Sequence, residues 1–286
     1  AAINRPLELH NLMIDTIDSM SSAEAEDPYR GNMNGESEKN TVWRHGAPPC
    51  YTEVNALFVN TRTKVWGEGS LEETVQNLVK TWEMELSHKT RVDDFKTIDP
   101  DNFSLKVNGN IPHSLPPWSS SSSLGYIELV DLLFVSGRAG LSAKETLEMG
   151  SYNALLQTSL QEEIQYYKTS METFDSSHDV FRRAFPGGFA WEVVEVYTGP
   201  PVVNFKFRHW GVMEGPFKGH APTGETVQFT GIAIAKVDEQ LRMVNVEVFY
   251  DPAELCGGLL KGPFDLNYGE YKTGIQGCPF HPSNSI

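Results

Sequence analysis

Residues 174–262 read FDSSHDVFRRAFPGGFAWEVVEVYTGPPVVNFKFRHWGVMEGPFKGHAPTGETVQFTGIAIAKVDEQLRMVNVEVFYDPAELCGGLLKG, and this stretch decides the fold. It opens with a short helix-like run that Pro186 and two glycines end, and Asp175 or Ser176 is the expected N-cap, which places His178 in the first turn. Four runs rich in β-branched and aromatic residues follow, and they predict strands over 190–198, 202–213, 227–237 and 242–250. The short connections after the first and third strands, and a longer one after the second, predict an antiparallel meander.

Alternation along the predicted strands assigns side chains to the two faces of the sheet. In the second strand, His209 shares a face with Phe205 and Phe207. The third strand carries small residues such as Ala233 and Ala235, which leave space beside them. Both faces carry apolar residues, so we expect helices of the same chain to cover one face and a long arm or a second subunit to cover the other.

Four strings in this region are specific enough to suggest a relationship. They are DSSH at 175–178, FRHWG at 207–211, MEGPFKGHAPTGE at 213–225 and FYDP at 249–252. Together with residues upstream, they resemble the pathogen-related protein group in the SnoaL-like (polyketide cyclase-like) branch of the nuclear transport factor 2-like superfamily. The resemblance covers residues 37–110 and 146–262. It implies an α+β fold, a cone-shaped curved antiparallel sheet wrapped around helices with a ligand cavity inside, but it implies no agreed chemistry.

The rest of the chain predicts one elaborated domain. We expect an N-terminal arm over 1–36, a SnoaL-like domain over 37–262 with a serine-rich insert at about 110–145, and a C-terminal tail over 263–286. The arm includes an amphipathic helix over 5–20. A long helix is predicted over 71–88, with Ser70 and Glu73 forming a capping box, and the sheet is expected to wrap around this helix.

Composition limits the partners and the compartment. The chain has 286 residues, and 38 acidic against 23 basic residues give a formal charge of −15, which disfavours nucleic acid and membrane surfaces. No apolar run approaches the roughly 20 residues of a membrane-spanning helix, so we expect a soluble protein. Cys50, Cys256 and Cys278 are too few for a disulfide framework, although a Cys256–Cys278 bond stays open. A cytoplasmic location is favoured, and an organellar or secreted protein after peptide removal remains an alternative.

Five residues are candidates for acid–base chemistry. His178 at a helix start and His209 among aromatic side chains would both be neutral, and a neutral imidazole can accept a proton. Asp251 could orient one imidazole, as carboxylates do in histidine-based sites, or simply cap a turn. Tyr197 and Tyr250 are candidate donors to an enolate oxygen. For each residue the structural alternative, a histidine or tyrosine satisfied in the core, also stays open.

A cavity of this kind needs apolar walls. The aromatic residues expected to bind the ligand are Trp82, Trp191, Phe205, Phe207, Trp210, Phe229 and Phe249. His209 and His220 flank a Gly- and Pro-rich segment over 214–225 that could swing over the mouth of the cavity, but no compact metal-ligand spacing accompanies them. Nucleotide-binding motifs are missing, and the Cys278-Pro279 pair is weak support for haem, so we expect neither a cofactor nor a metal.

Three classes of function follow from these patterns. The first is a cofactor-free cyclase, isomerase or dehydratase that acts on a small carbonyl compound by His/Asp acid–base chemistry. The second is a non-catalytic binder of a small apolar ligand, favoured by a wall in which both histidines are hydrogen-bonded. The third is an assembly subunit, as a homodimer or on a larger complex, favoured by a cone filled with bulky side chains.

Overall fold

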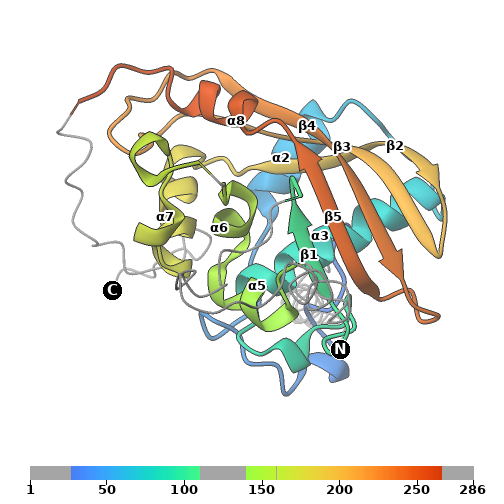
Figure 1. Cartoon of the computed structure of the whole chain (residues 1–286). Coiled ribbons are helices and arrows are strands. Elements are labelled where there is room, and N and C mark those ends of the chain that lie inside the picture. Colours follow the sequence, from blue (N-terminus) through green and yellow to red (C-terminus); the bar gives the residue numbers. More distant parts are fainter. Residues whose placement is uncertain (1–26, 110–139, 159, 266–286) are drawn as a thin grey trace, which may run out of the picture.

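A five-stranded sheet, in the order β1-β5-β4-β3-β2, curves across the long helix α3 (Figure 1). The computed structural model describes residues 27–109, 140–158 and 160–265. The strands are β1 Ser104–Val107, β2 Ala190–Thr198, β3 Val202–Val212, β4 Thr226–Val237 and β5 Met243–Tyr250. The helices are α2 Thr52–Thr61, α3 Leu71–His88, α5 Ala143–Met149, α6 Ser151–Leu156, α7 Phe174–Ala184 and α8 Pro252–Leu259, with short 3-10 turns η1 Glu36–Glu38, η2 Val92–Asp94, η3 Glu162–Ile164 and η4 Thr169–Met171.

The predicted meander is confirmed. Strands β2 to β5 pair antiparallel in chain order, and their limits lie within one residue of the predicted ones. Strand β1 adds to the free edge of β5 in parallel, with Ser104 opposite Asn245. The expected α+β architecture, a curved and mainly antiparallel sheet packed around helices, is therefore confirmed.

Helix α3 begins where the sequence predicts, but its cap is arranged differently. The Ser70 hydroxyl accepts a hydrogen bond from the Glu73 N–H at 3.2 Å. The Glu73 carboxylate accepts from the N–H of Gly69 at 2.6 Å and not from that of Ser70, so only half of the expected capping box forms. The helix packs against β2 on the concave side of the sheet.

The N-cap predicted for α7 is wrong. The helix starts at Phe174, and Thr173 and Ser176 form a reciprocal capping box with hydrogen bonds of 3.1 and 2.9 Å. Thr173 keeps an extended backbone, as an N-cap requires, whereas Asp175 and Ser176 already lie inside the helix. His178 is therefore in the second turn. The effect of the helix dipole falls off within the first turn, so burial has the larger effect on the charge of His178.

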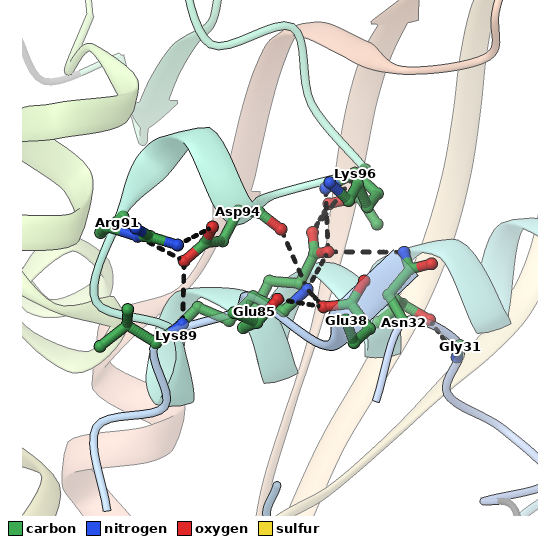
Figure 2. A network of polar contacts seen from close by, with 12 residues as sticks. Gly31, Asn32, Glu38, Glu85, Lys89, Arg91, Asp94 and Lys96 are labelled. Atoms are coloured by element: carbon green, nitrogen blue, oxygen red, sulfur yellow. Dashed lines mark hydrogen bonds and ion pairs between the residues drawn. The ribbon is translucent and has the colours of Figure 1, made fainter. Parts of the chain in front are cut away.

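A buried ionic network holds the residues before α2 against the end of α3 (Figure 2). The Lys89 ammonium is fully buried and donates to the carboxylates of Glu38 and Glu85 at 2.8 and 3.1 Å, and to the carbonyl of Asp94 at 3.0 Å. Glu85 also accepts from the backbone N–H of Lys96 at 2.9 Å. The network therefore joins three segments that are separate in sequence.

Residues 27–36, which the sequence assigns to the arm, also contact α3. The N–H of Gly31 donates to the Thr81 hydroxyl at 3.0 Å, and the side chains of Arg30 and Met33 are buried. The arm and insert boundaries remain proposals. Residues 5–20, the five serines at 119–123 and the Cys278-Pro279 pair lie outside the described residues.

The outer face of the sheet is covered only in part. Helix α2 packs on it through Phe58, whose ring lies 6.4 Å from that of Trp210, whereas Ile232 and Phe249 are 37% and 41% exposed. The segment that follows β3 does not form a lid over the cavity, because Phe217 is buried and exchanges backbone hydrogen bonds with His220. Within the described ranges, no helix has the length and apolar character needed to cross a bilayer.

Candidate functional site

A cavity of about 130 Å³ lies between the concave face of the sheet, α3 and α6. Most of its wall is apolar, and the polar side chains on it are Glu83, Ser151, Tyr152 and His209. Among the predicted ligand-binding residues, those that line it are Trp82, Trp191, Phe205, Phe207 and Phe229. Such a wall suits a small apolar guest that carries one or two polar atoms.

The predicted alternation of the strands builds the sheet side of this cavity. Phe205 and Phe207 line it from β3, and Ala233 and Ala235 line it from β4. Register places Phe207 opposite Gly231, where an added Cβ would come within 2.5 Å of the Phe207 ring. The small residues of β4 therefore accommodate the aromatic rings of β3 and leave the hollow beside them.

His209 is the histidine on the cavity wall. Its Nδ1–H donates to the carbonyl of Ala190 at 2.8 Å, and its ring stacks on Phe189 at 3.9 Å between centroids. This hydrogen bond fixes the tautomer, so Nε2 keeps its lone pair and has no protein partner among the described residues. Burial lowers the pKa of His209 to about 3, opposed by the bond to Ala190, so the ring is neutral at pH 7.

Glu83 is the acidic group on the wall. It lies one helical turn from Val79 and from Leu86, which also line the cavity. Burial raises the pKa of the Glu83 carboxyl, and the nearby charges of Arg30 and Lys80 oppose that rise. Sequence alone is compatible with Glu83 at the cavity mouth and with Glu83 on a solvated face of the helix. Its helical spacing to Val79 and Leu86 is the signal that could have placed it on the wall.

His178 does not line the cavity but lies next to Ser151, which does. Its Nδ1–H donates to the carbonyl of Phe174 at 2.8 Å, and its Nε2 lies 3.3 Å from the Ser151 hydroxyl and 3.4 Å from that of Ser87. The residue is only 8% exposed, and Tyr152 packs edge-on against it. Burial lowers its pKa to about 4, so His178 is neutral and already hydrogen-bonded on both nitrogens.

The structure places the other three catalytic candidates away from the cavity wall. The Tyr250 hydroxyl donates to the carbonyl of Leu155 at 2.7 Å. Asp251 caps α8 by accepting from the N–H of Ala253 at 2.9 Å, and Tyr197 is 51% exposed. Backbone carbonyls, and not Asp251, orient the imidazoles of both candidate histidines.

Two of the predicted ligand-binding residues face away from the cavity. Trp210 is buried against α2 on the outer side of the sheet, and Phe249 is exposed there. No three His, Cys, Asp or Glu side chains of the described segments come together as a metal site. His220 is tied to the carbonyl of Gly262 at 2.9 Å, and Cys278 is not described.

Comparison with known proteins identifies one curated relative with high coverage. A pathogen-related protein of Hordeum vulgare is 42% identical over 263 residues, which span 91% of this chain and 97% of that protein. No protein-family model matches the chain.

Solved structures are similar at low identity. An inferred polyketide cyclase of Acidithiobacillus ferrooxidans is 13% identical, with a TM-score of 0.36 over 69% of this chain and 100% of the other. An inferred SnoaL-like polyketide cyclase of Jannaschia sp. CCS1 is 14% identical, with a TM-score of 0.32 over 70% of this chain and 100% of the other. These similarities concern the fold alone.

Proposed function

The chain belongs to the pathogen-related protein family, and on that premise we propose that it binds a small carbonyl compound in its cavity and moves a proton on it through His209. One observation carries the proposal. His209 lies on an apolar wall with its Nδ1–H committed to Ala190, which leaves Nε2 as an acceptor.

The size of the cavity limits the substrate. A cavity of about 150 Å³ in another protein holds benzene, and the cavity here is about 130 Å³. The substrate is therefore about one ring, or a short chain, in size. Aromatic and aliphatic walls would hold its carbon skeleton and exclude water.

In the proposed step, Nε2 of His209 removes a proton from the carbon next to the carbonyl group. The C–H electron pair moves into an enolate, and the proton is held on the imidazolium. If the carbonyl compound is unsaturated, return of this proton to the far carbon of the conjugated enolate moves the double bond and gives isomerisation. Attack of the enolate carbon on a second carbonyl of the same molecule forms a C–C bond, and the resulting alkoxide takes the proton from the imidazolium, which gives an aldol cyclisation and restores neutral His209. Because burial lowers the pKa of His209 to about 3, the step depends on attraction between the imidazolium and the enolate inside the apolar cavity.

Exchange of the α-protons of cyclohexanone in D₂O, followed by proton NMR, tests this step. We expect the protein to accelerate the exchange above buffer, and His209→Phe to lower the rate by about 100-fold or more, towards the buffer rate. His220→Gln is the matched control, because His220 lies outside the cavity wall and is bonded to Gly262. Unchanged exchange in His209→Phe, with the protein still folded, would exclude His209 as the base.

A non-catalytic binder is the second candidate. The observation that favours it is the hydrogen bonding of His178 and Tyr250 into the protein, which leaves a wall with few polar groups. Binding of cyclohexanone, seen in the fluorescence of Trp82 and Trp191 without any exchange, would select this function. The third class of function, an assembly subunit, was expected to have a cone filled with bulky side chains. The cavity inside this domain does not favour that class.

A further inference from the structure

The cavity combines aromatic rings with one carboxyl group. Rings of Trp82 and Trp191 line it together with three phenylalanines, and Glu83 lies on the same wall. Among the described residues, the Glu83 carboxyl has no hydrogen bond or ion pair. The Glu83 side chain is partly buried on this apolar wall, and a carboxylate in such surroundings is stabilised by a bound cation or by taking up a proton.

The protein's own cations near Glu83 are engaged elsewhere. The Arg30 guanidinium donates to Asp27 at 3.4 Å and to Asn55 at 2.8 Å. The Lys80 side chain is 1% exposed, with Nζ 3.0 Å from the ring centroid of Phe58, and burial lowers its pKa to about 6. At pH 7 its amine therefore gives Glu83 little countercharge.

We infer that the ligand of this cavity is a small organic cation, whose ammonium group pairs with Glu83 while its apolar body lies against the aromatic walls. The inference rests on the proposed function, since it defines the class of carbonyl compound that His209 would act on. Aromatic faces attract cations, most strongly where water is excluded. The formal charge of −15 also draws cations towards the protein and repels anions.

A matched series of single-ring ligands tests the charge of the guest. Cyclohexylamine, which is protonated at pH 7, cyclohexanol and cyclohexanecarboxylate differ mainly in the group on the ring. Dissociation constants from calorimetry or from the fluorescence of Trp82 and Trp191 should rank the amine tightest and the carboxylate weakest. We expect the amine to bind at least about tenfold more tightly than the alcohol, which corresponds to about 1.4 kcal/mol.

Glu83→Gln should remove the preference for the amine and leave the affinity for cyclohexanol within about twofold. Glu68→Gln is the control, because it changes the net charge equally at an exposed loop position. Its preference for the amine should equal that of the unaltered protein. A loss of the preference in Glu68→Gln would mean that overall charge, and not Glu83, selects the ligand.

Equal affinities for the amine and the alcohol in the unaltered protein would overturn the inference. Tighter binding of the alcohol would also overturn it and would assign Glu83 the role of a protonated hydrogen-bond donor. Cyclohexanone exchange, measured on the same samples, separates the two proposals. Exchange that requires His209, without any preference for the amine, refutes the cationic ligand and leaves the proposed function standing.

Discussion

Burial and backbone carbonyls together control the charge of the histidines near the cavity. Burial lowers the pKa of His209 to about 3 and that of His178 to about 4, and each Nδ1–H is held by a carbonyl oxygen. Burial lowers the pKa of His88 to about 3. All three rings are therefore neutral at pH 7, and protonating any of them opposes folding.

This effect predicts an acid-sensitive stability to which His178 contributes. Because the folded pKa is about 4 and the ordinary value is about 6.5, the unfolded chain binds more protons between these pH values. The free energy of unfolding therefore falls as pH drops through this window, with a slope of up to about 1.4 kcal/mol per pH unit for one histidine. His178→Gln should flatten the dependence by that amount, as measured by urea unfolding at pH 4.5, 5.5 and 7.5. An unchanged slope would show that His178 keeps an ordinary pKa.

At the residue scale, the sequence predicted which side chains share a face but not what they contact. Alternation placed His209 with Phe205 and Phe207, and the structure confirms that placement. The bond from His209 to Ala190 depends on the register between β2 and β3, which pairs Trp191 with His209. That register is set by contacts between strands, so local sequence does not reveal the tautomer.

Secondary-structure elements are joined here by buried ions as well as by apolar packing. The end of α3 carries Glu85 and Lys89, both fully buried, and Glu38 reaches them from the segment before α2 (Figure 2). The Glu85 carboxylate also accepts from the N–H and the hydroxyl of Thr97. Loss of the Lys89 charge would leave the two buried carboxylates without a cation.

Lys89→Met should therefore destabilise the fold by about 3–5 kcal/mol, because Glu38 and Glu85 would lose their shared cation in a buried site. Urea unfolding at pH 7 measures the change. Lys39→Met provides the comparison, since the Lys39–Glu36 pair is 69% and 87% exposed and should contribute almost nothing. Equal effects of the two substitutions would contradict the structural role assigned to the network.

Strands were easier to predict than helix starts. Each strand of the meander has its own alternation and turn residues, and the limits follow from these local signals. At α7, Thr173, Asp175 and Ser176 are all good N-cap residues, so composition alone could not choose among them. The parallel addition of β1 to β5 joins Ser104 to Asn245 across 141 positions, and no local pattern encodes it.

Over the whole molecule, the hollow depends on parts far apart in the sequence. Helix α3, helix α6 and all five strands each supply a share of its wall. The sequence predicted a cavity through family resemblance and the small residues of β4. It could not give the polar side chains that would accompany His209, because Glu83 and Ser151 meet the sheet only after folding.

Truncation tests how much of the chain supports this fold. Residues 27–36 supply the buried side chains of Arg30 and Met33 and the bond from Gly31 to Thr81. A chain of residues 37–286 should thus be less stable than one of residues 27–286, by a few kcal/mol, in urea unfolding. Identical midpoints and slopes for the two chains would show that residues 27–36 do not stabilise the domain.

Two alanines of β4 help to set the size of the cavity. Ala233 and Ala235 border the interior, so replacement of either alanine by valine would shrink the cavity while backbone pairing stayed intact. The groups proposed to select and transform the guest lie on α3 and β3, whereas these two small side chains lie on β4. Exchange of side chains on this one strand would therefore change the size of the molecule that fits inside, with the rest of the fold unaltered.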